Sequence, residues 1–123
     1  MTQILISAIV GIMLFFTVVV APTVFKVLPN EWSSAYIRSF FPKYYLALGL
    51  ITFLAVFISP DLDIKVYLLI CGALFLVSLL YLTPRINAAK DNHQNRRFHF
   101  LHMTSVIINM IQLAIYIYLL TRI

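Results

Sequence analysis

The sequence predicts an all-α integral membrane protein, a four-helix up-and-down bundle in which residues 1–123 form a single transmembrane domain. The chain is 63% hydrophobic and only 11% charged, whereas soluble domains are nearer half apolar and a quarter charged. It also contains four hydrophobic runs without a charge, and each has roughly the length that a helix needs to cross a hydrocarbon core of about 30 Å. These runs are Thr2–Phe25, Tyr44–Pro60, Val66–Pro84 and Phe98–Thr121.

The first run predicts a helix over about residues 3–21. No basic segment precedes it, so we interpret it as a retained membrane helix and not as a cleaved signal peptide. The helix is expected to end at Ala21-Pro22, because proline lacks an N–H donor and disfavours helical geometry at the residue before it.

Residues 30–41 allow two interpretations. Asn30 is a good helix N-cap, and Trp32, Tyr36 and Phe40 recur every four residues, so the three aromatic rings share one side of a helix. This pattern is typical of an interfacial helix that lies in the headgroup region. The alternative is that residues 30–41 form the first turns of a long, kinked second helix, which otherwise covers about residues 44–59.

The third and fourth helices are predicted over about residues 64–84 and 97–121. The short loop SPDLDIK makes the second and third helices an antiparallel hairpin, and the hydrophilic segment TPRINAAKDNHQNRR separates the third helix from the fourth. Four helices use nearly the whole chain, so any chemistry takes place inside the bundle or in its loops.

Basic residues predict the orientation in the membrane. Seven Lys and Arg residues lie in or beside the loops after the first and third helices, and two lie on the other side. Because cytoplasmic loops carry the excess of positive charge, both termini are expected on the periplasmic side of a bacterial inner (cytoplasmic) membrane. The same loops account for the net charge of +5, so nucleic acid is excluded as a partner and the lipid bilayer is the expected one.

Two lines of polar residues run along the third and fourth helices. His102, Ser105, Asn109 and Gln112 recur at steps of three and four, so they share one side of the fourth helix. In the third helix Ser78, Tyr81 and Arg85 follow the same rule. Since lipid tails offer no hydrogen bonds, these lines are expected to face each other as a polar seam. The seam either binds a partner protein, a lipid or a small ligand, or only packs the helices together.

His99 and His102 form an H-x-x-H pair, whose rings lie on one side of a helix and could share a metal ion. A haem- or metal-binding protein centred on His102 is therefore the alternative function, and a transporter of small solutes along the seam is a weaker one. The charge-free runs contain no carboxylate, which excludes paired-carboxylate and Ser-His-Asp catalysis inside the membrane. We expect no enzyme, no catalytic residue and no dedicated cofactor.

Four motifs in order carry a family resemblance: GIMLFFTVVVAPTVFKVLP, FFPKYY, TPRIN and FxFLHxxSxxxNxxQ. Together they resemble the transmembrane-protein-205-like family, whose membership implies a four-helix, multi-pass protein of the bacterial inner membrane with a domain of unknown function. The resemblance adds Asn87 to the candidate seam. Besides the bilayer, the partners expected for such a seam are another membrane protein or a second copy of the chain. More loosely, the layout is similar to four-helix families tied to haem or copper handling. The matching positions are Phe25, Pro42, Tyr44, Pro84, Arg85, Asn87, His102, Ser105, Asn109 and Gln112.

Overall fold

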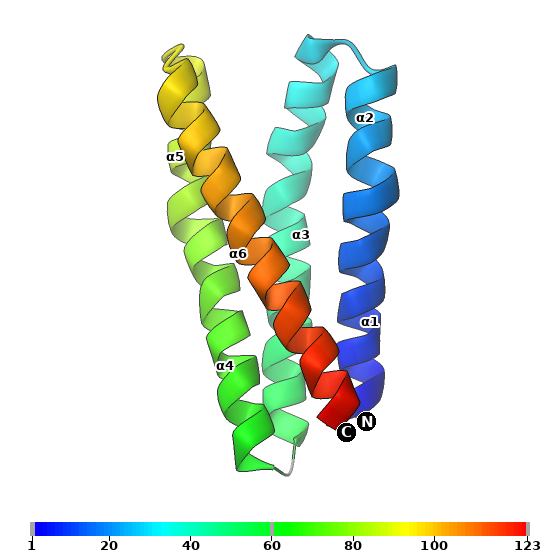
Figure 1. Ribbon diagram of the computed structural model, residues 1–123. Coiled ribbons are helices and arrows are strands. Elements are labelled where there is room, and N and C mark those ends of the chain that lie inside the picture. The colour runs from blue at the N-terminus through cyan, green and yellow to red at the C-terminus, as the bar shows by residue number, and fades with distance from the viewer. Residues whose placement is uncertain (1, 60, 123) are drawn as a thin grey trace.

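The computed structural model describes residues 2–59 and 61–122, and in these ranges the chain forms four long helical rods (Figure 1). All four rods are long and apolar enough to cross a membrane, which confirms the prediction of an all-helical protein with four membrane-length helices. The first rod consists of α1 (Thr2–Phe15), the π-helix η1 (Phe16–Val20) and α2 (Ala21–Val27), and the second is α3 (Asn30–Ile58). The third consists of α4 (Leu62–Val77), the π-helix η2 (Ser78–Leu82) and α5 (Thr83–Asp91), and the fourth is α6 (Asn95–Arg122).

Consecutive rods run in opposite directions, so both ends of the chain lie at the same end of the bundle (Figure 1). We call this the terminal end, and we call the opposite end, where α2 meets α3 and α5 meets α6, the basic end. α6 crosses the bundle obliquely, from a position beside α5 at the basic end to one beside α1 at the terminal end (Figure 1). This crossing separates α6 from α2 at the basic end (Figure 1).

The first rod does not end at Ala21, as predicted, but continues to Val27. Instead of breaking the helix, Pro22 follows a widened π-helical turn in which the Ala21 N–H bonds to the Phe16 carbonyl, five residues back. The same arrangement precedes Pro84, where the Thr83 N–H bonds to the Ser78 carbonyl. Proline disturbs the regular i→i−4 hydrogen bonds of an α-helix, but a widened π-helical turn has already replaced these bonds before each proline. The helical rod therefore continues past the proline.

Residues 30–41 are the first turns of α3, which is the second of the two alternatives for this segment. α3 is therefore one continuous helix from Asn30 to Ile58 and contains Pro42. The sequence predicts the start of the second membrane helix near residue 44, which is inside this longer helix. The structure contains no bilayer, so a headgroup location for this segment stays a prediction.

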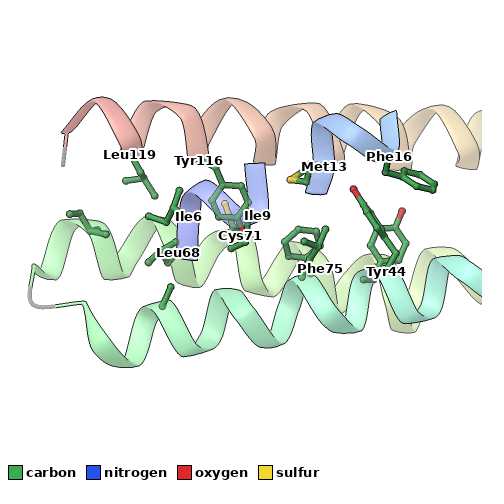
Figure 2. Close-up of a cluster of buried hydrophobic side chains, with 14 residues drawn as sticks. Ile6, Ile9, Met13, Phe16, Tyr44, Leu68, Cys71, Phe75, Tyr116 and Leu119 are labelled. Atoms are coloured by element: carbon green, nitrogen blue, oxygen red, sulfur yellow. The ribbon is translucent and has the colours of Figure 1, made fainter. Parts of the chain in front are cut away.

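The packed core fills the terminal half and the middle of the bundle (Figure 2). Side chains from all four rods meet there, and Tyr116 stacks on Phe75 with ring centroids 6.4 Å apart. Farther toward the basic end the core becomes aromatic, and Phe16 stacks on Phe40 at 4.9 Å. The fully or nearly buried apolar members are Ile6, Ile9, Met13, Phe16, Tyr44, Tyr45, Leu48, Ala55, Ile64, Leu68, Cys71, Phe75, Tyr116 and Leu119.

A tight turn joins α5 to α6 at the basic end. His93 has a left-handed backbone with φ of 56°, its N–H bonds to the Lys90 carbonyl at 3.1 Å, and the Gln94 N–H bonds to the Ala89 carbonyl at 2.9 Å. This pair of bonds is a Schellman motif, which satisfies carbonyls that the end of a helix leaves free. The motif fixes α6 directly beside α5.

Candidate functional site

A groove of about 810 Å³ opens at the basic end, between α3 on one side and α5 and α6 on the other. Its volume lies in the range of roughly 300–1,000 Å³ that is usual for small-molecule sites. Phe25 of α2 also contributes to its wall. We call it the basic-end groove, and it is lined by Phe25, Glu31, Ser33, Ser34, Ala35, Ile37, Arg38, Phe41, Tyr45, Thr83, Ile86, Asn87, Lys90, Asp91, Phe98, His102 and Ser105.

Polar contacts between α3 and α5 join the two walls at the mouth of the groove. Arg38 Nη2 donates to Asp91 Oδ1 at 2.7 Å and to the Asn87 carbonyl at 3.3 Å. Lys90 Nζ donates to Ser34 Oγ in the same region. The ion pair is 46% and 59% exposed at its two side chains, so it contributes little stability, about 0–1 kcal/mol. Its effect is to compensate charge at the mouth.

The inner end of the groove carries neutral hydrogen-bonding groups. Ser105 Oγ donates to the His102 carbonyl at 2.7 Å, and the Tyr45 hydroxyl interacts with the Ser105 side chain. The His102 ring stacks on Phe98 with centroids 6.0 Å apart and planes 8° apart. Glu31 at the mouth and Tyr45 at the inner end are separated by about 20 Å along α3, from the helical rise of about 1.5 Å per residue. The groove is therefore deep as well as wide.

The middle of the groove is apolar. Phe41 lines it from α3 and Ile86 lines it from α5, while Ile37 adds an apolar side chain beside Arg38, at the level of the charged contacts. Phe98 of α6 completes this wall, and the Lys90 ammonium lies 5.5 Å from its ring centroid. The lining thus changes from charged, through apolar, to neutral and polar along its depth.

On α6, the residues predicted for the seam all turn away from the open surface. His102 and Ser105 line the groove, while Asn109 and Gln112 lie deeper in the bundle. Gln112 is completely buried and donates through Nε2 to the Cys71 carbonyl at 2.9 Å. Among the described residues, Gln112 Oε1 is buried without a hydrogen-bond partner, whereas the Tyr44 hydroxyl and the Asn109 side chain lie close enough to interact with each other.

On the third rod, the predicted residues separate. Ser78 is buried and its carbonyl accepts the Thr83 hydroxyl at 2.8 Å, and Asn87 lines the groove. Tyr81 and Arg85 instead lie on the outer face, where the guanidinium stands 4.2 Å from the Tyr81 ring centroid. The structure therefore brings Asn87, His102 and Ser105 to one groove and leaves Tyr81 and Arg85 outside it.

The two histidines considered for metal binding also differ in position. His102 faces the groove, whereas His99, one turn earlier on α6, is exposed and is not part of the lining. Over residues 2–59 and 61–122, no three His, Cys, Asp or Glu side chains gather into a group that could hold a metal ion. Of the described groove residues, His102 is the one histidine and lies at the inner end, while the carboxylates Glu31 and Asp91 lie at the mouth, so they do not converge on one point with it.

Several residues of the basic-end groove were not predicted from the sequence. Ser34 and Arg38 lie in the segment 30–41, whose placement the sequence left open, and Lys90 and Asp91 lie in the hydrophilic segment after the third helix. The two pairs meet because α3 and α5 both extend as helices to the basic end. The available signal was the presence of opposite charges in the two segments at the same end of the bundle. Tyr45, near the start of the predicted second helix, is buried at the inner end of the groove.

A family model for DUF4149, a domain of unknown function, matches residues 4–95, which is more than half of the chain. The chain belongs to this family. In this DUF4149 protein the matched region covers the rods that contribute α3 and α5 to the groove, and nearly all of α6 lies beyond it. No curated protein and no solved structure matches the chain. The function of this DUF4149 protein therefore has to be argued from its groove.

Proposed function

We propose that this DUF4149 protein is a multi-pass protein of the bacterial inner membrane that binds an amphipathic small molecule in the basic-end groove. One observation carries the proposal: the lining is charged at the mouth, apolar in the middle and neutral but polar at the inner end. Such a graded wall matches a ligand with an apolar body and a hydrogen-bonding group. A site lined mainly by apolar side chains with a few convergent polar groups is the usual form of a small-molecule site.

The charges in the groove indicate a ligand without net charge at its buried end. The lining contains two acids, Glu31 and Asp91, and two bases, Arg38 and Lys90, and Arg38 is already paired with Asp91. At the inner end the available groups are the hydroxyls of Tyr45 and Ser105 and the imidazole of His102. These groups donate to or accept from a hydroxyl or a carbonyl. The ligand we propose carries such a group and inserts it first.

A partner helix fits the groove less well than a small molecule does. A helix with its side chains is about 10–12 Å across, and the contacts Arg38–Asp91 and Lys90–Ser34 link the two walls at the mouth. Both would have to break to admit a helix. Passage of a solute through the bundle is also less well supported, because the terminal half contains fully buried side chains such as Ile6, Ile9 and Tyr116.

Two separate arguments support the proposed orientation of the protein and the membrane in which it lies. The excess of basic residues at one end supports a cytoplasmic basic end and periplasmic termini. The resemblance to the transmembrane-protein-205-like family supports a bacterial inner membrane. The groove would then open toward the cytoplasmic leaflet, where it is accessible to lipid-soluble molecules and to the cytoplasm.

The test is to purify the full chain in a mild detergent and to identify every retained small molecule by mass spectrometry. Ile37→Trp adds an indole to the apolar part of the groove wall, beside Arg38, and should abolish retention. Leu54→Trp is the matched control, because Leu54 lies on the same helix but is 52% exposed on the outer surface. The wild type and the control should retain one small molecule in common.

Two results would contradict the proposal: a wild type that retains nothing, or an Ile37→Trp variant that retains the same molecule as the wild type. Circular dichroism of each variant establishes that the helices are intact. A haem absorption band, or a stoichiometric metal lost in His102→Ala, would replace the proposal with the haem or metal alternative. A stoichiometric membrane protein lost in Ile37→Trp would replace it with a partner-binding function.

A further inference from the structure

The outer face of the α5–α6 hairpin contains a second, separate hollow of about 460 Å³. It shares no lining residue with the basic-end groove, so α5 lies between the two. Arg85 and Arg97 line it together with the amide side chains of Asn92 and Gln94, and Leu80 and Tyr81 line its other part. We call it the outer hollow.

The outer hollow is strongly basic. Its lining contains two guanidinium groups and no carboxylate. Across residues 2–59 and 61–122 the ion pair that forms is Arg38–Asp91, on the other side of α5, so neither Arg85 nor Arg97 has a carboxylate partner there. Two uncompensated guanidiniums, each with five donors in a planar fork, fit the oxygens of a phosphate group.

The position of the hollow along the bundle indicates which phosphate it meets. The charge-free run Val66–Pro84 is about 28 Å long as a helix, close to the hydrocarbon thickness of about 30 Å. Arg85 follows this run directly, so it lies where the hydrocarbon ends and the headgroups begin. Leu80, one turn earlier, is 71% exposed on the outer surface, within the hydrocarbon.

From this arrangement we propose that the outer hollow binds the phosphate group of an anionic membrane phospholipid. Arg85 and Arg97 contact the phosphate, Asn92 and Gln94 hydrogen-bond the rest of the headgroup, and an acyl chain lies along Leu80. Basic pockets between helices on the cytoplasmic side of a membrane bind anionic headgroups in this way. A free phosphate ion shares the headgroup chemistry but would not use the apolar part of the hollow.

The experiment is native mass spectrometry of the full chain in dodecyl maltoside, titrated with phosphatidylglycerol. Arg85→Gln/Arg97→Gln should weaken the Kd about 30-fold, because each basic residue near an anionic lipid contributes about fivefold. Lys26→Gln/Arg96→Gln is the matched control. It removes the same charge at the same end of the bundle, from exposed positions that line neither hollow. The control should change the Kd less than about threefold.

Three outcomes would overturn the proposal. An equal loss in the control would mean that net charge, and not the hollow, attracts the lipid. Zwitterionic phosphatidylcholine bound as tightly as phosphatidylglycerol would remove the role of the uncompensated arginines. Inorganic phosphate that displaces phosphatidylglycerol at equal concentration would identify a site for the free ion. Should the double variant fail to fold, binding to the wild type decides: raising NaCl from about 50 to about 500 mM should weaken it strongly, and an unchanged Kd would refute the proposal.

Discussion

At the scale of single residues, the interior of the bundle is organised by hydrogen-bonding side chains on α6 and their partners on α3 and α4. Tyr116 Oη lies 2.6 Å from Thr52 Oγ1, which in turn donates to the Leu48 carbonyl at 2.8 Å. Because Thr52 uses its proton on Leu48, Tyr116 is the donor in the Tyr116–Thr52 bond. Both side chains are fully buried, so this bond cannot be replaced by bulk water.

The Tyr116–Thr52 hydrogen bond predicts that removing its acceptor lowers the stability of the protein more than removing its donor does. Thr52→Val removes the Thr52 acceptor and leaves the buried Tyr116 hydroxyl beside the Cys71 thiol, a weaker partner, so it should lower the free energy of unfolding by about 1–3 kcal/mol. Tyr116→Phe removes the donor while Thr52 still bonds to Leu48, so it should cost no more than about 1 kcal/mol. The double variant should be more stable than Thr52→Val alone, because it leaves no unpaired hydroxyl.

The measurement is a double-mutant cycle from reversible unfolding in mixed micelles, with circular dichroism as the signal. If the two single effects simply added in the double variant, the bond would carry no coupling energy and the arrangement of donors given above would be wrong.

The α6 residues could be placed from the sequence because α6 is a regular α-helix, in which steps of three and four keep side chains on one face. The contact of Arg38 with Asp91 could not be placed in this way. The two residues are 53 positions apart, and their meeting depends on how far α3 and α5 extend and on which faces they turn to each other. Residue type and local spacing reveal neither the length of α3 and α5 nor the faces that these helices turn to each other.

At the scale of elements, the two π-helical turns have the greatest effect. Each precedes a proline, η1 before Pro22 and η2 before Pro84. A turn closed by i→i−5 bonds holds about one residue more than an α-helical turn. Residues beyond it are therefore rotated by most of the roughly 100° that separates neighbours in an α-helix. This rotation moves Arg85 off the line that begins at Ser78 and brings Ile86 and Asn87 to the groove.

The same geometry explains which element-scale predictions failed. The charge-free runs located all four rods, because their length and composition suffice for that purpose. The expected end at Ala21 was wrong, since the rule that proline ends a helix assumes regular α-geometry before it. The expected seam position of Arg85 relied on the same assumption. A π-turn has no distinctive composition, so the sequence alone did not reveal either one.

From this follows a prediction about deletions. Leu80 lies within η2 and is 71% exposed, so deleting it should convert the π-turn into an α-turn and keep both flanking segments in register. The loss in the free energy of unfolding should stay within about 2 kcal/mol. Deletion of Leu50, equally exposed at 62% but inside the α-helical stretch of α3, rotates one part of that helix by about 100° and should cost more than about 4 kcal/mol.

Thermal unfolding followed by circular dichroism separates the two deletions. A Leu80 deletion as damaging as the Leu50 deletion would show that η2 is not an extra residue tolerated within a rod. In that case the rotation of Arg85 would need another cause.

At the scale of the whole molecule, the two ends of the bundle differ in packing. α6 approaches α1 at the terminal end and α5 at the basic end (Figure 1). The core fills the terminal half, and the basic-end groove opens in the other half between α3 and the pair α5 and α6. Both π-turns and their prolines also precede the segments at the basic end. The composition could predict a four-helix membrane bundle, but not the groove, because the groove depends on the crossing angle of α6.

The asymmetry in charge predicts which end faces the cytoplasm, and the chain offers a direct measurement. Its only cysteine, Cys71, is completely buried, so the wild type should not react with a membrane-impermeant maleimide. Asn92→Cys places an exposed thiol at the basic end and Leu62→Cys places one at the terminal end, and neither changes a charge. With seven basic residues at one end against two at the other, Leu62→Cys should react in intact cells and Asn92→Cys only in inverted vesicles. The opposite pattern would reverse the orientation, and labelling of both positions from one side would mean that the third rod, which joins them, does not cross the membrane.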